Sequence, residues 1–260
     1  MRKRFVYIFL LIGHFSVAQE SVSMLPTEQY TSLNTNHFSK AVITEFSVQK
    51  NNLLNIIQQE YCFWNEPKNR TERELSSVKK IKEYWKCLQI FPTTKQVQSF
   101  NWQEAHPWSA AFISWCMKSA GYENNFLYAP NHAKYIIWAR DNRINKKYEN
   151  PFWAYYISDN EAANPEPGDL ICKNREGKTH TLETIYKTAI SHCDIILEVD
   201  KANGIVITIG GNVADKVNKR WVFLDTDGYI DTNAAWLSFD ATGISSTGSQ
   251  KDFFTVIKVH

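Results

Sequence analysis

Apolar side chains recur at helical spacing in the first part of the chain after about residue 38. In residues 38–62 the apolar positions are three and four residues apart, which predicts one or two helices. A further helix is expected through about Leu88, because Thr71 and Glu74 resemble a capping box that opens it. One face of this helix would be apolar, with Val78, Ile81, Tyr84, Trp85 and Leu88 on it.

The next helix is predicted from the stretch HPWSAAFISWCMKSAG, residues 106–121. Pro107 suits the first turn, where its missing N–H costs nothing, and Gly121 suits the position just past the end. This placement puts Ser109 in the first turn of the helix. A second, short helix is expected over residues 131–140.

Strand-like patterns replace the helical ones after about residue 165. Asn203-Gly204 and Asp227-Gly228 are strong hairpin signals between such runs. The expected strands cover residues 169–172, 190–199, 205–210, 217–224 and 253–259. Helices followed by antiparallel strands predict an α+β domain.

The first 18 residues have the layout of a secretory signal peptide. A basic start, MRKR, precedes a short apolar run, and small residues lead to an expected cleavage after Ala18. We therefore expect an exported protein, periplasmic or extracellular, without a stable membrane anchor. Residues 19–37 are polar and predict a flexible lead-in. One domain should follow over residues 38–260, with a helical part at 38–100 and a core at 105–260.

The net charge and the spacing of possible metal-binding residues limit the partners and cofactors that we expect. Cleavage would remove three of the 29 basic residues and none of the 27 acidic ones, so the formal charge would change from +2 to about −1. This balance disfavours nucleic-acid binding. The sequence has no CxxC motif and no pair of histidines at the spacing of a helical zinc site, so we expect no metal and no cofactor. We also expect a monomer.

Five cysteines lie after the leader, and an odd number leaves at least one unpaired in an exported protein. Cys62 and Cys87 could form a disulfide. Cys116 lies two turns after Ser109 on a similar face of the helix, so we interpret it as a buried packing residue. Cys193 follows His192, but their side chains point to opposite faces of a strand.

Three positions could carry chemistry. Ser109 would lie where free backbone N–H groups favour negative charge, although serine is also common in first turns for capping alone. In the strand SHCDIILEV, His192 and Asp194 share one face, so Asp194 could orient a basic His192; a structural histidine is the alternative. Asn212 follows Gly210 and Gly211 and could contact His192, or could belong to a plain glycine turn.

The motifs PWSAAFISW, PEPGDLI, SHCDII and IGGNV, in this order, resemble an uncharacterised bacterial family, domain of unknown function 2272. The resemblance spans roughly residues 50–225 and includes YAPNHAKYI. The family looks like a branch of the NlpC-like and CHAP-like peptidases and amidases. That likeness implies a papain-like α+β fold, with N-terminal helices packed on an antiparallel sheet of about five strands.

The same resemblance implies site roles. The superfamily begins its core helix with a cysteine nucleophile, and that position holds Ser109 here. His192 would be the base, and Asn212 or Asp194 would orient it. Trp108 is expected to line the cleft, and His132 to contact substrate or to cap its helix.

Three functions follow as hypotheses. The first is an exported amidase or peptidase that cleaves an amide bond in peptidoglycan or a related cell-wall peptide. The second is a non-catalytic module that binds a cell-wall peptide or glycan on the same fold. The third is a cysteine enzyme that uses Cys116 or Cys193, which the expected side-chain directions disfavour.

Overall fold

The protein is an antiparallel sheet covered on one face by helices. The computed structural model describes residues 40–67, 70–240 and 243–260. The predicted signal peptide and lead-in therefore lie outside the described residues. Within the described part of the chain, no helix is long and apolar enough to cross a membrane.

Six α-helices form within residues 40–144, and the four predicted helical regions are all helical. Their bounds are α1 Lys40–Asn65, α2 Leu75–Lys86, α3 Thr94–Gln98, α4 Phe100–Ala105, α5 Ser109–Ser119 and α6 His132–Ile144. The segment before α5 contains the short helices α3 and α4, which were not among the predicted helices. Capping by local side chains explains both: Thr93 and Gln96 form a capping box, and Ser99 caps α4.

Eight strands form one sheet in the part of the chain that the structure describes, whereas about five were expected. They are β1 Phe152–Tyr156, β2 Leu170–Asn174, β3 Ser191–Asp200, β4 Ile205–Gly210, β5 Asn218–Phe223, β6 Ala235–Asp240, β7 Gly243–Ser249 and β8 Phe253–Val259. Strands β1, β6 and β7 were not among the predicted strands. The last of these is GISSTGS and is largely exposed, so it has no apolar alternation that could have predicted it.

The strand order is β1-β8-β2-β3-β4-β5-β6-β7, and every pairing is antiparallel. The last strand, β8, lies between β1 and β2, so the C-terminal segment is in the interior of the sheet. β3 and β4 form a hairpin whose turn contains Gly204 with a φ of +65°. The predicted turn at Gly228, with a φ of +83°, is also confirmed.

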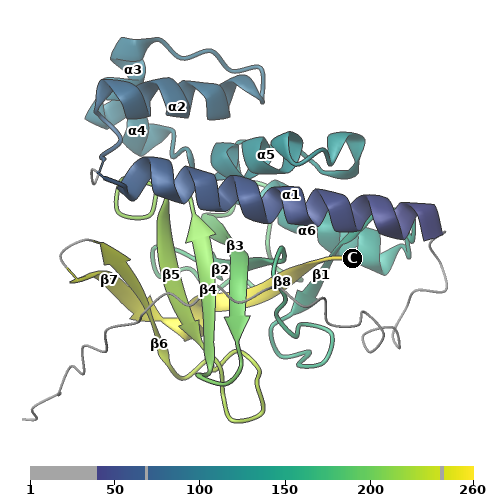
Figure 1. Cartoon of the computed structure of the whole chain (residues 1–260). Helices are drawn as coiled ribbons and strands as arrows, with labels where there is room; N and C mark the ends of the chain where they lie inside the picture. Colours follow the sequence, from purple (N-terminus) through teal and green to yellow (C-terminus); the bar gives the residue numbers. More distant parts are fainter. Residues whose placement is uncertain (1–39, 68–69, 241–242) are drawn as a thin grey trace, which may run out of the picture. The chain divides into compact units, whose positions relative to one another are not determined.

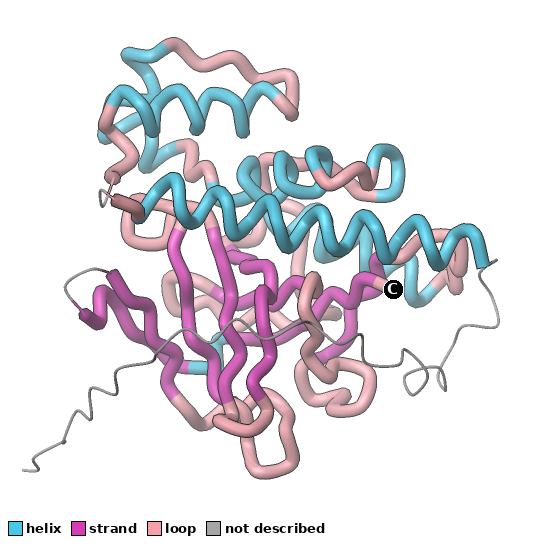
Figure 2. Tube along the Cα trace, viewed as in Figure 1, coloured by secondary structure: helices cyan, strands magenta, loops and turns pink. Residues whose placement is uncertain are grey.

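Helices α1, α5 and α6 contact the sheet, and α2 packs on α5 away from the strands (Figure 1). Figure 2 shows the same separation of helices from strands in the tube trace. A large apolar core joins the helices to one face of the sheet, with members such as Trp64, Phe112 and Ile195. A smaller core, including Ile171, Val222 and Trp236, covers the other face.

The helix that carries Ser109 begins and ends close to the predicted positions. Trp108 is the N-cap residue, so Pro107 precedes the helix instead of lying in its first turn. Gly121 follows the C-cap and has a φ of +93°, a conformation that glycine adopts without a steric penalty. Near α2, Glu74 accepts the N–H of Thr71, but the helix itself begins only at Leu75.

One disulfide joins the neighbouring strands β2 and β3, between Cys172 and Cys193. The suggested pairing of Cys62 with Cys87 is wrong, since both are free thiols. Cys116 is free and fully buried, as predicted. Alternation along β3 directs Cys193 into the helix-side core and leaves His192 and Asp194 on the opposite face.

Loss of this disulfide should destabilise the protein. The bond closes a loop between cysteines 21 residues apart, which corresponds to about 3 kcal/mol of unfolding free energy from unfolded-state entropy. Denaturant titrations with and without reductant would measure the effect. Reductant should lower the unfolding midpoint of the wild type and of Cys62→Ser, but not that of the double variant Cys172→Ala with Cys193→Ala. An unchanged wild-type midpoint would contradict the prediction.

Candidate active site

Ser109 is the first residue of α5 and is 3% exposed. The first intrahelical bond here is donated by Phe112 to the carbonyl of Trp108. The N–H groups of the preceding turn have no acceptor inside the helix, and the helix dipole makes this end electropositive. The Ser109 hydroxyl therefore lies beside backbone donors that could hold a negative oxygen.

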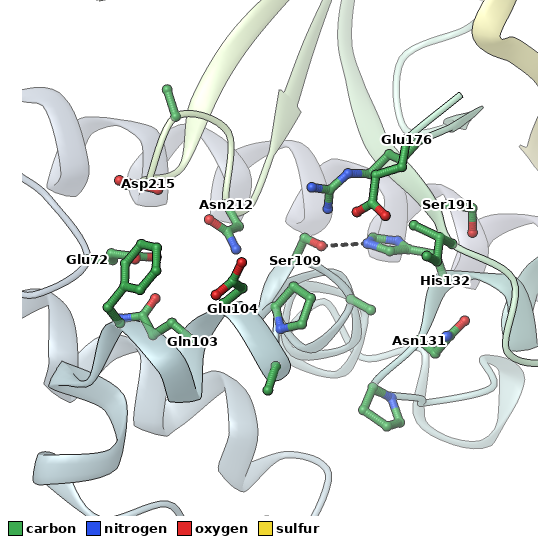
Figure 3. A pocket seen from close by; sticks show the side chains of 18 of the residues that line it. Glu72, Gln103, Glu104, Ser109, Asn131, His132, Glu176, Ser191, Asn212 and Asp215 are labelled. Carbon is green, nitrogen blue, oxygen red and sulfur yellow. Dashed lines mark hydrogen bonds between the residues drawn. The ribbon is translucent and has the colours of Figure 1, made fainter. Parts of the chain in front are cut away.

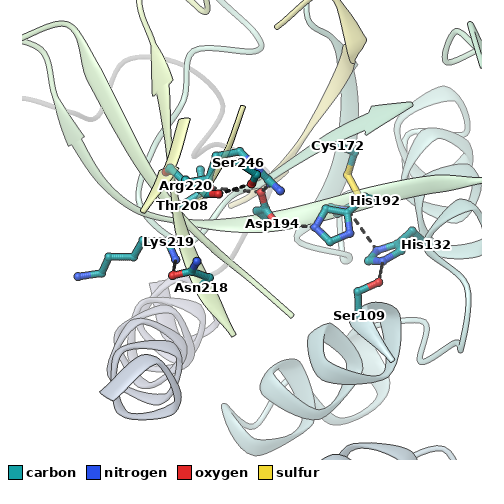
Figure 4. Close-up of polar contacts among 12 residues, drawn as sticks. Ser109, His132, Cys172, His192, Asp194, Thr208, Asn218, Lys219, Arg220 and Ser246 are labelled. Atoms are coloured by element: carbon teal, nitrogen blue, oxygen red, sulfur yellow. Dashed lines mark hydrogen bonds and ion pairs between the residues drawn. A yellow bond between two sulfur atoms is a disulfide. The ribbon is translucent and has the colours of Figure 1, made fainter. Parts of the chain in front are cut away.

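The Oγ atom of Ser109 lies 2.7 Å from Nε2 of His132, the first residue of α6 (Figure 4). Asn131 caps α6 by accepting the N–H of Ala133, which places the His132 ring at the start of the helix. The expected capping role of His132 is thus filled by Asn131. The imidazole is 5% exposed and contacts Ser109 directly.

The other ring nitrogen of His132 faces two hydrogen-bonding groups. The backbone N–H of Cys193 in β3 donates to Nδ1 over 3.2 Å, and the hydroxyl of Tyr135 also contacts Nδ1. A backbone N–H can only donate, so Nδ1 accepts and the ring proton of the neutral imidazole lies on Nε2. In this arrangement His132 donates its hydrogen bond to Ser109.

His192 belongs to a second polar group beside the first. Its Nε2 lies 2.8 Å from Oδ1 of Asp194, and its ring centroid lies 5.1 Å from that of His132. Asp194 also accepts from Thr208 over 3.3 Å and forms an ion pair with Arg220 on β5. The carboxylate is 1% exposed, so these three donors replace water around its charge.

Two glycines at the end of β4 make room for these contacts. A Cβ on Gly210 would lie 1.8 Å from Oδ1 of Asp194, and a Cβ on Gly211 would lie 2.7 Å from Cβ of Phe112 on α5. The first glycine therefore admits the carboxylate, and the second lets α5 approach the sheet. Neither position has room for a side chain.

Burial holds both histidines neutral. The pKa of His132 is well below its usual value because the ring is buried, and the nearby His192 and Arg175 lower it further. Burial also lowers the pKa of His192, with Arg220, Arg175 and Lys173 adding to the effect. Neutral imidazoles can act as bases near neutral pH.

A pocket of about 810 Å³ opens above Ser109 (Figure 3). His132, Ser191 and Glu176 line it on one side of Ser109, while Asn212, Glu72 and Asp215 line it on the other. Two buried polar atoms of lining residues, Oγ of Ser191 and Oε1 of Gln103, have no hydrogen-bond partner among the described residues. Both residues line the pocket, and each keeps one buried polar atom without a partner in the described part of the chain.

The structure groups the predicted site residues differently from the sequence analysis. Ser109 meets His132, and His192 meets Asp194. Asn212 lines the pocket, and no hydrogen bond joins it to His192 in the described part of the chain.

Trp108 does not line the cleft as expected, because its side chain is fully buried. Its ring centroid lies 5.2 Å from that of Trp64 in a stacked arrangement, and its Nε1 donates to Glu72 over 3.0 Å. Tyr135 and Arg220 were not predicted as site residues. Tyr135 follows His132 by three residues on α6, a spacing that places both on one helix face and could have revealed the contact.

No group of metal-binding side chains occurs within the described ranges. Cys193 is bound in a disulfide and has no free thiol, and burial raises the pKa of the Cys116 thiol well above its usual value. Neither is placed to act as a thiolate nucleophile.

Residues 72–259 match the model of a family described as an uncharacterized protein conserved in bacteria, domain of unknown function 2272. The chain belongs to this family. The match includes Ser109, both histidines, Asp194 and the whole sheet, so the family region contains the complete site. Comparisons with curated proteins and with solved structures give no match.

The two histidines should make this family member sensitive to acid. Each has a folded pKa below its unfolded value of about 6.5, so the unfolded state binds more protons as the pH falls. The unfolding free energy should therefore fall below about pH 6.5, by up to about 1.4 kcal/mol per pH unit for each histidine. Denaturant titrations from pH 7.5 to 5 would measure the slope. The slope should decrease in His132→Gln, and an equal slope in that variant would contradict the assignment.

Replacing the Asp194 carboxylate should lower the free energy of unfolding. In Asp194→Asn the buried Arg220 loses its counter-charge, which should reduce the unfolding free energy by about 3–5 kcal/mol. Glu198→Gln is the matched control, because Glu198 lies on the same strand and is exposed; it should change stability by less than about 0.5 kcal/mol. Chemical denaturation would compare the two variants, and equal stability would refute the predicted role of the buried ion pair.

Proposed function

We propose that the protein is an exported hydrolase, an amidase or peptidase that cleaves an amide bond in peptidoglycan or a related cell-wall peptide. The observation that carries this proposal is the 2.7 Å contact between Ser109 Oγ and His132 Nε2 at the edge of a pocket of about 810 Å³. A hydroxyl, a neutral imidazole and a helix N-terminus together supply a nucleophile, a base and oxyanion donors.

The likeness to NlpC-like and CHAP-like enzymes supports the same reaction. The helix with the nucleophile position packs against an antiparallel sheet that carries a histidine, as a papain-like arrangement requires. The signal-peptide pattern of residues 1–18 supports export to the wall.

In the proposed mechanism, Ser109 Oγ attacks the carbonyl carbon while its proton passes to Nε2 of His132. Backbone N–H groups in the first turn of α5 stabilise the oxyanion. The C–N bond then breaks, and His132 returns the proton to the departing amine. A water molecule, deprotonated by His132, then attacks the ester carbonyl; the bond between the acyl carbon and Ser109 Oγ breaks, His132 returns the proton to Oγ, and the acid is released.

This role requires the second tautomer of His132, with the ring proton on Nδ1. Tyr135 can accommodate it, since a hydroxyl either donates to Nδ1 or accepts from it, whereas the Cys193 N–H would lose its acceptor in this tautomer. His192, fixed by Asp194, lies behind His132 and keeps that ring in an environment that favours the neutral form. Its expected role as the direct base is the competing assignment within the same proposal.

A specific observation favours a second candidate, a non-catalytic module that binds a wall peptide or glycan. The Cys193 N–H directs the His132 proton to Nε2, so that Ser109 receives a hydrogen bond instead of losing a proton. In this case the pair would only shape the binding pocket.

Incubation of the purified protein with isolated peptidoglycan, followed by mass spectrometry of released fragments, tests the proposal. Wild type should release fragments, and Ser109→Ala and His132→Gln should each lose at least about 100-fold in rate. His106→Gln is the control, because His106 is exposed, contacts Trp102 on α4 and is not among the residues that line the pocket. Its rate should equal that of the wild type.

The remaining outcomes separate the alternatives. Full activity in His132→Gln with loss in His192→Gln would assign the base to His192. Release of fragments by Ser109→Cys but not by the wild type would indicate a hydrolase site in which the serine is not reactive. A thiol ionises more readily than a hydroxyl, so the cysteine could act as the nucleophile there. Binding of peptidoglycan without cleavage by any variant would favour the binding module.

A further inference from the structure

We propose that the pocket holds a subsite for an ammonium group of the bound molecule, formed by Glu72, Gln103 and Asp215 on one side of Ser109. The inference deepens the proposed function, since it names a chemical group that the substrate must carry. It rests on the pocket and on Ser109 as its reaction centre, and its binding test does not depend on turnover.

The first observation is the placement of hydrogen-bond acceptors in the pocket. Figure 3 draws Glu72, Gln103 and Asp215 on the same side of Ser109, together with Glu104. An ammonium group has three donors and no acceptor, so it matches carboxylate and amide oxygens. Charged donors bound to carboxylates also make the stronger class of hydrogen bond.

Gln103 supplies an independent observation. Its side chain is 4% exposed, and its Nε2 donates to the carbonyl of Val97 over 2.5 Å. That carbonyl can only accept, which fixes the orientation of the amide and leaves Oε1 as the free end. Oε1 is buried without a partner among the described residues, and Gln103 lines the pocket. A buried acceptor without a donor is costly unless a ligand supplies the donor.

Glu72 is held rigidly at this end of the pocket. Trp108 Nε1 donates to its Oε2 over 3.0 Å, and the buried Trp108 stacks on Trp64. Its other oxygen lies 3.6 Å from the guanidinium of Arg73, whose side chain is half exposed. Arg73 thus compensates only part of the negative charge that Glu72, Glu104 and Asp215 place here.

The pKa of Glu72 is consistent with this uncompensated negative charge. Burial raises the pKa of its carboxyl group, and the nearby Asp215 raises it further against the lowering effects of Trp108 and Arg73. A cation bound between Glu72 and Asp215 would remove this repulsion. The opposite side of the pocket contains Arg175 next to Glu176, so acceptors do not dominate there.

An ammonium group can come from the amino terminus of a peptide or from a lysine-type side chain. Three peptides separate these sources: acetyl-Ala-Ala-norleucine-Ala-amide, which is neutral; the same peptide with a free amino terminus; and acetyl-Ala-Ala-Lys-Ala-amide. Their affinities would be measured by ligand-observed NMR titration on the full chain carrying Ser109→Ala, so that no peptide is cleaved.

At least one cationic peptide should bind about tenfold more tightly than the neutral one. Asp215→Asn should reduce this preference, and so should Glu72→Gln. Because Asp215 is exposed, its replacement should leave the fold intact; thermal unfolding would verify that for both variants. Glu176→Gln is the matched control, a pocket carboxylate on the other side of Ser109, and it should retain the preference.

Equal affinities for the neutral and cationic peptides, or no binding of any of them, would overturn the subsite. Loss of the preference in Glu176→Gln alone would also overturn it. Cleavage of peptidoglycan by a wild type without the preference would refute the subsite but not the hydrolase. A preference without any cleavage would refute the hydrolase and support the subsite.

Discussion

A single buried imidazole joins three elements of the structure. His132 begins α6, contacts Ser109 on α5 through Nε2 and accepts the N–H of Cys193 on β3 through Nδ1. Both nitrogens must be satisfied because the ring is buried, so the relative positions of the two helices and the strand are fixed by its hydrogen bonds. The same bonds set the tautomer, and the tautomer decides whether Ser109 can give up its proton.

A second group of buried polar side chains, centred on Asp194, lies next to the His132 ring. Asp194 has its charge balanced by Arg220 and its remaining oxygen sites filled by His192 and Thr208. Removing one member of such a buried ion pair strongly destabilises a protein, but the intact pair adds little stability compared with an apolar core. Its presence next to a neutral histidine pair is therefore better explained by the electrostatics of the site than by folding, and Gly210 provides the space that it needs.

Local sequence patterns predicted many of the helices and strands. The start of α5 near Ser109, its end at Gly121, and the common face of His192 and Asp194 all depend on residues that are neighbours in the chain. The partner of Ser109 was predicted to be His192, whereas the contact is made by His132. Trp108 was expected in the cleft for its aromatic character, but stacking on Trp64 and the bond to Glu72 place it in the core. The exposed strand β7 had no apolar pattern to reveal it.

The sequence by itself determined the α+β class, the approximate bounds of most helices and strands, the family, and part of the set of polar residues in the site, including Ser109, His132, His192 and Asp194. Those features depend on periodicity, capping and turn residues, which act over a few positions. Only the tertiary structure decided that β8 lies between β1 and β2, that Cys172 pairs with Cys193, and that His132 contacts Ser109. These are contacts between segments distant in the chain, and their choice depends on how whole helices and strands bury their apolar faces against each other.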